Sequence, residues 1–456
     1  MSVPAHEATT RHLGAIYPFA AEQVTSHDDV ADAESWLGGV FAYDPFALYR
    51  RGLLTNPNML VVGQIGRGKS AFVKTYLWRM AAFGHRAWVV DPKGEYGPLA
   101  RAWGVEPIML RPGGGVRLNP LDAARAAGVG TAGDPQIPEA DDVDRRRAEL
   151  LSSLASASLG RALLPTERSA VDVAVAHVSR APASSAARDD SARTRSGAPF
   201  CGPTVPDVVD ALLQPTKESA RALHTDVETL TADARQVALE LRRLVAGDLR
   251  GMFDGLTSPG IRLDASLVVL DLSAVYHSAA LGVLMTCAAS WLHAALAGGT
   301  NNDPSMAPGA LVVVDEAWAV LANLAVARWL QSSWKLSRSW GVANVAVLHR
   351  LSDLDSAGQA GSEQVGLAHG LLADSETRII YAQTPEEIER AAPLLGLSST
   401  EADVVPQLHR GVALWKVGAR SFLVQHRLSP FEEPIVDTDA RMGYAPPRHR
   451  TFSDQS

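Results

Sequence analysis

One stretch decides the fold of this chain: Met59-Leu60-Val61-Val62-Gly63-Gln64-Ile65-Gly66-Arg67-Gly68-Lys69-Ser70. It reads as a short apolar strand, a glycine-rich turn and a lysine–serine pair that opens a helix. The spacing G-x-x-x-x-G-K-[ST] is met by Gly63, Gly68, Lys69 and Ser70. The alternative is a glycine-rich turn that precedes a helix by chance, but the complete spacing in a strand–loop–helix context favours a phosphate loop.

The chemistry of such a loop follows from its backbone. Glycines let N–H groups close around phosphate oxygens, and the positive end of the helix dipole adds to the attraction. Lys69 is expected to reach the β- and γ-phosphates and to be catalytic, and the Ser70 hydroxyl to ligate Mg²⁺. The full set of candidate nucleotide-binding residues in the loop is Gly63, Gln64, Ile65, Gly66, Arg67, Gly68, Lys69, Ser70 and Ala71.

Composition limits the class of protein. The chain has 456 residues, of which 46% are hydrophobic and 20% charged, as in a soluble globular protein. The net charge of −8 gives no general attraction for nucleic acid, so any DNA contact would be local. The two cysteines lie far apart, which argues against a disulfide framework and favours the cytoplasm. The apolar run 279–292 is shorter than the roughly 20 residues of a membrane span, so we expect a buried core helix.

Two further strands carry acidic residues at their carboxyl ends. Residues 87–90 lead into Asp91-Pro92-Lys93-Gly94-Glu95-Tyr96, and ligands bind at this edge of a parallel sheet. Asp91 and Glu95 are therefore candidates to hold Mg²⁺-bound water or the attacking water, although a solvated Pro-Gly turn explains them equally well.

The strand 311–314 runs into Asp315-Glu316. Beside a phosphate loop, Asp315 is expected to hold Mg²⁺ through its water shell, and Glu316 to polarise the attacking water as general base. The Trp-rich helix that follows, residues 318–336, is interpreted as core packing. It leads to the strand 343–348, which ends at His349, a candidate contact for the γ-phosphate.

The chain divides by composition. We predict an N-terminal extension (1–55), a first part of an α/β core (56–122), a helical insertion (123–262), a second part of the core (263–440) and a disordered tail (441–456). The insertion holds the basic triplet Arg145-Arg146-Arg147, which either lies on a solvated helix face or contacts DNA.

Five motifs in this order carry a resemblance. They are the phosphate loop, Asp91 to Tyr96, Asn119-Pro120-Leu121, Asp315-Glu316-Ala317-Trp318 and Leu351-Ser352-Asp353-Leu354. They resemble the HerA–FtsK superfamily and, within it, the ATPase domain of conjugative type IV secretion ATPases (the fourth component of the VirB system, TraC-like). The resemblance implies an α/β fold: a RecA-like P-loop NTPase core with a mostly parallel sheet and an all-helical insertion domain. It also implies a hexameric ring with ATP bound between subunits.

The resemblance assigns two more residues. Arg378 stands where relatives have an arginine placed to reach a neighbouring subunit's γ-phosphate. His349 stands at the sensor position, where the family usually has glutamine, often after threonine. Secretion ATPases carry a large domain ahead of the phosphate loop, whereas barely sixty residues precede the loop here. Whether a separate polypeptide supplies that domain stays open.

The sequence therefore predicts an ATPase that uses ATP and Mg²⁺ and drives a conjugative or type IV secretion system, energising DNA or protein transfer. Its expected partners are further copies of itself, channel proteins and DNA through local contacts. It is expected in the cytoplasm or at the inner face of the cell membrane, held there only through partners. Two alternatives stay open: an FtsK-like duplex DNA translocase, and an assembly subunit that binds ATP and hardly hydrolyses it. A GTPase would need an Asn-Lys-x-Asp motif, which is absent.

Overall fold

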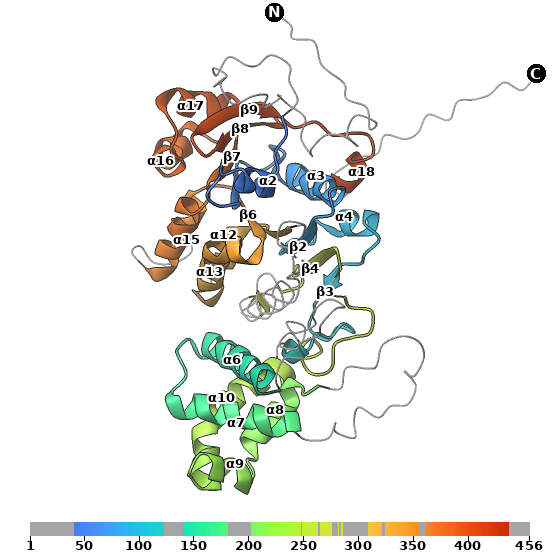
Figure 1. The fold of residues 1–456 in the computed structure, drawn as a ribbon, viewed down its shortest axis with the longest axis vertical. Helices are drawn as coiled ribbons and strands as arrows, with labels where there is room; N and C mark the ends of the chain where they lie inside the picture. The colour runs from blue at the N-terminus through green and yellow to red at the C-terminus, as the bar shows by residue number, and fades with distance from the viewer. Residues whose placement is uncertain are drawn as a thin grey trace, which may run out of the picture.

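A mixed sheet forms the centre of the computed structural model (Figure 1). Its strand order is β3-β4-β2-β5-β6-β1-β7-β8-β9. The strands are β1 (Met59–Val62), β2 (Arg86–Asp91), β3 (Ile108–Met109), β4 (Leu267–Asp271), β5 (Ala310–Val314), β6 (Val342–Leu348), β7 (Thr377–Tyr381), β8 (Val412–Val417) and β9 (Arg420–Gln425). The structure describes residues 41–122, 140–180, 202–247, 249–262, 265–275, 281, 284–285, 309–321, 324–355 and 362–436.

The strand pairing is parallel from β3 through to β7, and only β7–β8 and β8–β9 are antiparallel. The central strands are buried along their whole length, which explains their continuous apolar sequence: helices cover both faces of the sheet. The predicted mostly parallel α/β sheet is confirmed.

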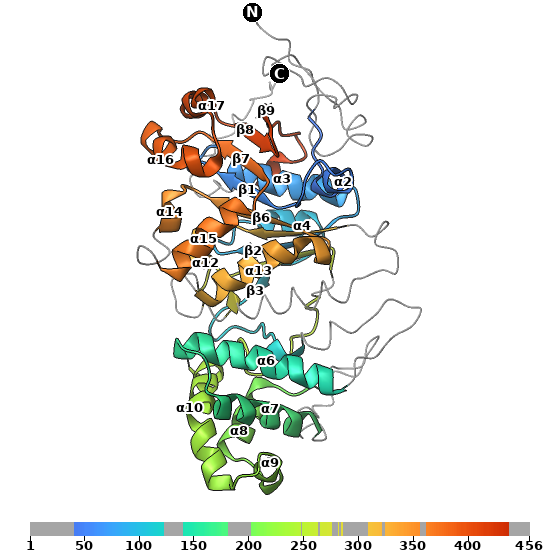
Figure 2. The same ribbon diagram turned by 60° about the vertical axis from the view of Figure 1, so that its left-hand side comes forward.

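Alternate residues of each strand enter two different cores. In β1, Met59 and Val61 pack with Phe72 of the phosphate-loop helix, whereas Leu60 packs with Trp334 on the opposite face. The first face carries α2 (Pro45–Arg50), α3 (Lys69–Ala81), α4 (Gly97–Ala102) and α18 (Glu433–Val436). The second face carries α12 (Ala317–Leu321), α13 (Leu324–Trp340), α14 (Ser352–Asp355) and α15 (Glu363–Ala373) (Figure 2). Beyond these lie α16 (Pro385–Leu395), α17 (Ser399–Val404) and the 3₁₀ turn η4 (Val405–Gln407).

The chain leaves the sheet after β3 and returns at β4, and between them the helices form a separate lobe below the sheet (Figure 1). These helices are α6 (Ala140–Leu159), α7 (Pro165–Arg180), α8 (Val205–Leu213), α9 (Lys217–Ala222) and α10 (Val227–Ala246). Leu151, Val171, Val208 and Leu241 fill the centre of the lobe and are fully buried. An all-helical block therefore lies where the sequence indicated an insertion.

The Asn-Pro-Leu motif joins the lobe to the sheet. It leads into the 3₁₀ turn η1 (Pro120–Asp122), where the Asn119 side-chain amide donates to the Pro203 carbonyl at 3.0 Å. Asp122 accepts a hydrogen bond from Thr257 at 2.6 Å. Because these contacts tie together the outgoing and the returning chain, the motif has a structural role at the base of the lobe.

The described part of the predicted N-terminal extension packs into the core. Tyr43 is buried, and its hydroxyl donates to Thr377 Oγ1 of β7 at 2.7 Å. Of the apolar run 279–292, only Leu281, Leu284 and Met285 are described, and all three are buried in the core. The predicted tail 441–456 lies outside the described residues. Among the described helices, none has the length and apolar character that crossing a membrane requires.

Candidate nucleotide site

The strand order brings distant segments to one edge of the sheet. Strand β6 lies between β1, which leads into the phosphate loop, and β5, which ends at Asp315-Glu316. All three strands are parallel, so their carboxyl ends meet at the same edge. The Gly63 amide donates to the Leu348 carbonyl at 3.3 Å, which places the phosphate loop beside His349.

Glycine is required at several points of the loop. Gly66 and Gly68 have φ angles of 78° and 108°, in the left-handed region that residues with a Cβ rarely adopt. A Cβ at Gly63 would lie 2.4 Å from Tyr381 Cβ, so this position also needs glycine because the backbones approach closely. The Gly411 amide, just before β8, donates to the Arg67 carbonyl at 3.0 Å and supports the loop from the hairpin side.

Lys69 opens helix α3 and folds back over the loop. Its Nζ donates to the carbonyl of Gly63, to that of Gln64 at 3.0 Å, and lies 3.0 Å from His349 Nδ1. Burial lowers the pKa of Lys69 to about 8, although the carboxylates of Glu316 and Asp315 act in the opposite direction. The ammonium group therefore occupies the mouth of the loop with its donors turned toward the protein.

Glu316 is held by three donors. His349 Nε2 lies 2.7 Å from Oε1, Lys93 forms an ion pair with the same oxygen, and Trp318 Nε1 donates to Oε2 at 2.6 Å. Burial raises the pKa of this carboxyl, but the hydrogen bonds from His349 and Lys93 outweigh it and lower the pKa to about 2. The backbone φ of Glu316 is +50°, unusual for a residue with a side chain, which marks a strained turn at this edge.

His349 connects the phosphate loop to the acidic pair. A protonated Lys69 has no lone pair, so His349 Nδ1 must accept, and the ring hydrogen must lie on Nε2 and point to Glu316. The backbone carbonyl of His349 is held in turn by the side-chain amide of Gln383 at 2.7 Å. The imidazole therefore has one defined tautomer and orientation.

Asp315 and Ser70 carry the oxygen ligands that Mg²⁺ prefers. Asp315 is buried and accepts hydrogen bonds from the Tyr96 hydroxyl at 3.0 Å and from the Glu316 amide at 2.9 Å. Burial raises the pKa of Asp315, and the neighbouring Glu316 carboxylate adds to this. A cation beside it would relieve both effects. No cluster of three His, Cys, Asp or Glu ligands occurs in the described part of the chain. Mg²⁺ suits such a site, since it takes one or two protein oxygens and completes its shell with phosphate and water.

The hexapeptide after β2 supplies different residues from those expected. Both oxygens of Asp91 accept backbone hydrogen bonds of its own turn, from Lys93 at 3.2 Å, Gly94 at 2.9 Å and Tyr96 at 2.9 Å. Burial raises the pKa of Asp91 to about 6. Glu95 is half-buried and does not line the cavity described below. Two side chains of this turn reach the acidic pair: Lys93 pairs with Glu316, and the Tyr96 hydroxyl donates to Asp315.

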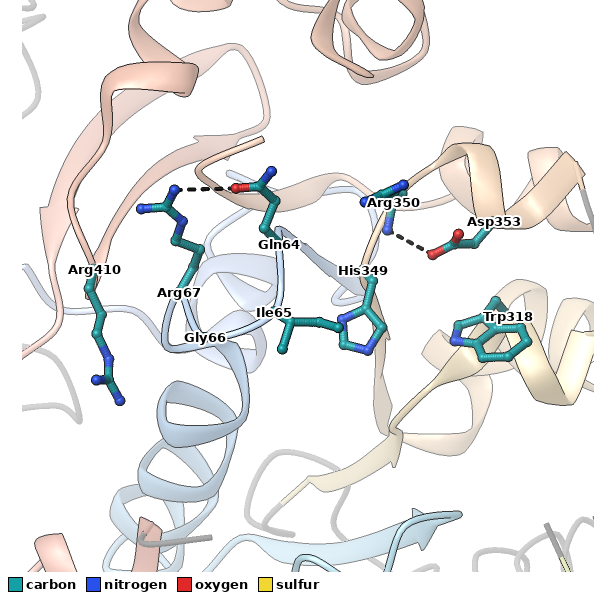
Figure 3. Close-up of a pocket in the computed structure, with 9 residues that line it drawn as sticks. All are labelled: Gln64, Ile65, Gly66, Arg67, Trp318, His349, Arg350, Asp353 and Arg410. Atoms are coloured by element: carbon teal, nitrogen blue, oxygen red, sulfur yellow. Dashed lines mark hydrogen bonds between the residues drawn. The ribbon is translucent and has the colours of Figure 1, made fainter. Parts of the chain in front are cut away.

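A cavity of about 760 Å³ opens in front of the loop (Figure 3). Its wall is formed by Gln64, Ile65, Gly66, Arg67, Trp318, His349, Arg350, Asp353 and Arg410. Arg67 and Arg410 flank the loop on one side, whereas His349 and Trp318 face it from the other. The interpretation of the Trp-rich helix as core packing holds for Trp334, which is buried. Trp318 also packs against this core, but its indole in addition lines the cavity and donates to Glu316.

Sequence reasoning missed Lys93, Trp318, Arg350, Asp353 and Arg410. For the first two a local signal existed: Lys93 lies in the hexapeptide already singled out, and Trp318 follows Asp315-Glu316 by two residues. Arg410 had none, since it reaches the cavity only because β8 adds to the sheet beside β7.

Arg378 lies on β7 and is not among the residues that line the cavity. Its guanidinium donates to the carbonyls of Leu395 at 2.9 Å and Leu372 at 3.2 Å, and burial lowers its pKa. It is anchored within its own chain, and contact with a neighbouring subunit's nucleotide stays a prediction.

Comparison with known proteins supports the fold. The structure is similar to that of VirB4 from Thermoanaerobacter pseudethanolicus, with a TM-score of 0.61 and 20% identity over 87% of this chain and 96% of that one. The plasmid coupling protein TrwB, solved with a non-hydrolysable ATP analogue, matches with a TM-score of 0.48 and 15% identity over 82% of this chain and 85% of that one. The genome packaging NTPase B204 of Sulfolobus turreted icosahedral virus 2 matches with a TM-score of 0.32 and 10% identity, over 81% of this chain and 98% of that one.

No protein-family model matches the sequence, and neither does any curated protein. The likeness to VirB4 confirms the predicted fold, a RecA-like P-loop ATPase fold, and with it the resemblance to type IV secretion ATPases at the level of the fold.

Proposed function

We propose that this protein binds ATP with Mg²⁺ and hydrolyses it to ADP and phosphate. One observation carries the proposal: the buried phosphate-loop Lys69 and the acid Glu316 contact the two ring nitrogens of a single histidine, His349, at the wall of one cavity. A lysine for the phosphates and an acid for the attacking water are the two groups that this hydrolysis needs in one place.

Each residue has a distinct task in this proposal. The amides of residues 63–71 and the N-terminus of α3 bind the phosphates, and Lys69 neutralises charge on the β- and γ-oxygens. Ser70 and Asp315 would hold Mg²⁺, which supplies further neutralisation of the phosphate charge. Glu316 accepts the proton of the attacking water, and His349 holds the carboxylate in place.

For the biological role, we infer a motor of a conjugative or type IV secretion system that energises DNA or protein transfer. The support is the VirB4-like fold together with the motif order described above. On this reading the subunits form a hexamer, and channel proteins hold the ring peripherally at the membrane.

An FtsK-like translocase would need basic surface for duplex DNA, and the basic triplet of the insertion offers little. Arg145 and Arg146 both pair with Asp142, and Arg147 is buried against Asp144. Because Asp142 and Asp144 offset part of this positive charge within α6, the triplet makes a weaker electrostatic footprint for DNA than three unpaired arginines would.

An assembly subunit with little hydrolysis is favoured by one observation. All three donors around Glu316 are in place, and an acid so held is a poor proton acceptor. We infer instead that this is the resting arrangement of an ATPase, in which Glu316 is held until nucleotide binds.

An ATPase assay with and without duplex DNA separates these functions. A secretion motor is expected to turn over ATP with little response to DNA, and to sediment as a hexamer with nucleotide. Length-dependent stimulation that falls steeply with salt would favour the translocase instead. Tight ATP binding without turnover in the assembled ring would favour the assembly subunit.

A further inference from the structure

We propose that Lys93 is a second phosphate ligand of this site, which holds Glu316 in the nucleotide-free protein and moves to the γ-phosphate of ATP when it binds. The inference rests on the proposed function, because it assumes that the cavity takes a nucleoside triphosphate. It makes Lys93 the residue by which the site distinguishes ATP from ADP.

The position of Lys93 is the first argument. It follows β2, the neighbour of β5 in the sheet, and therefore approaches Glu316 from the side opposite to β6 and the phosphate loop. Its Nζ pairs with Glu316 Oε1 and lies 3.4 Å from His349 Nε2, while Lys69 Nζ lies 3.0 Å from Nδ1 of the same ring. Two ammonium groups thus stand on either side of the His349 imidazole, which itself forms part of the cavity wall.

Hydrogen bonds hold the backbone of the turn that carries Lys93, whereas the Lys93 side chain is partly exposed to solvent. Asp91 accepts hydrogen bonds from three backbone amides of the turn, and Tyr96 is buried and bonded to Asp315. The Lys93 side chain keeps 40% of its surface exposed, against 4% for Glu316. The backbone therefore fixes where the lysine starts, and the flexible stem allows its ammonium group to change partner.

The difference in charge between the Glu316 carboxylate and a γ-phosphate favours the change of partner by Lys93. A γ-phosphate carries more negative charge than one carboxylate, so a lysine beside it gains by changing partner. Glu316 then keeps its bonds to His349 and Trp318, which hold it in place, while Oε1 loses the lysine. ADP lacks the γ-phosphate and offers Lys93 no such partner. The resting arrangement of Glu316 is thereby linked to the identity of the nucleotide.

Nucleotide binding tests the proposal without relying on turnover. Lys93→Met keeps the stem and removes the charge, Lys93→Arg restores the charge, and Lys335→Met changes an exposed lysine on α13 as a control. Dissociation constants for ADP and for a non-hydrolysable ATP analogue, both with Mg²⁺, are measured by calorimetry. We expect Lys93→Met to raise the dissociation constant of the ATP analogue about tenfold or more, which corresponds to the loss of one charged hydrogen bond. The dissociation constant of ADP should change by no more than about twofold. Lys93→Arg is expected to recover part of the loss, and Lys335→Met to have no effect.

A second measurement uses the unaltered protein and so does not depend on whether a variant folds. The amine of Lys93 is labelled with an amine-reactive reagent, and its labelling rate is compared with that of Lys335 by mass spectrometry. We expect the ATP analogue, but not ADP, to slow the labelling of Lys93. Equal loss of affinity for both nucleotides, or equal labelling in their presence, would show that Lys93 only holds Glu316 and would overturn the proposal. If the unaltered protein binds neither nucleotide, the proposed function itself fails.

Discussion

His349 Nε2 lies 2.7 Å from the Glu316 carboxylate, across the neighbouring strands β6 and β5. The other nitrogen of the ring lies 3.0 Å from Lys69, so this contact extends the phosphate loop to the acidic pair. A change at the glycine-rich loop can therefore reach Glu316, the proposed base, through the side chain of His349.

Replacing Lys69 by alanine is expected to abolish ATP turnover and to weaken the binding of both ATP and ADP. The side chain is 4% exposed and is the loop's only lysine, so water cannot replace its charge. Turnover and calorimetric binding check this, with Lys335→Ala as a control on α13. Unchanged ATPase activity in the Lys69 variant would refute the assignment of the loop.

Glu316→Gln should trap bound ATP and lower hydrolysis by roughly 10² to 10⁴-fold, the usual contribution of a general base. The amide is nearly isosteric with the carboxylate, so folding should be retained. Single-turnover kinetics measure the effect, and the exposed Glu228→Gln on α10 serves as control. If the variant turns over normally, the base lies elsewhere, and Glu95→Gln is the next variant to examine.

Arg378→Ala tests whether the active site is shared between subunits. If Arg378 reaches a neighbour's γ-phosphate, variant subunits mixed with unaltered ones should lower activity by more than their mole fraction. The bonds of Arg378 to Leu395 and Leu372 predict some loss of thermal stability as well, so the melting temperature is measured in parallel. A strictly proportional decline in activity would argue for a self-contained monomer.

Gly63→Ala should destabilise the fold by about 1–3 kcal/mol, as overpacking does, because its Cβ would meet Tyr381 Cβ at 2.4 Å, between two adjacent backbones. Gly366 offers a matched control, since it lies in helix α15 with open space around it. Gly366→Ala is expected to be neutral or stabilising by up to about 1 kcal/mol. Denaturant unfolding of the two variants measures the difference, and equal stability of the two would contradict the close approach seen here.

The burial of His426 predicts that the folded protein loses stability in acid. Burial lowers its pKa from 6.5 to about 4, Arg79 acts in the same direction, and Glu432 opposes both. The unfolded chain therefore binds the proton more tightly than the folded protein does. The stabilisation that the neutral, buried His426 contributes is complete above pH 6.5 and is lost as the pH falls toward 4. Each pKa unit of difference between the folded and the unfolded state corresponds to about 1.4 kcal/mol of unfolding free energy. His426→Gln should give a shallower decline of unfolding free energy over this range, and an identical slope would contradict the assignment.

Much of the site followed from the sequence because its signals are local. The glycine spacing, the apolar strand before it and the acids after 311–314 each concern neighbours along the chain, and the strands formed where these patterns predicted. Asp91 shows the limit of such signals. An acid after a strand suits both catalysis and a capped turn, and only the hydrogen bonds to its own turn distinguish the two.

The sequence by itself determined the glycine-rich loop between β1 and α3, the acidic strand end and the helical block between them, because spacing and hydrophobic periodicity are properties of short segments. The tertiary structure alone decided that β6 lies between β1 and β5, that Lys93 rather than Asp91 reaches Glu316, and that Trp318 and Arg410 face the cavity. These relationships depend on the order in which strands pair and on the direction of each side chain. Both are fixed by packing between segments that lie far apart in the chain.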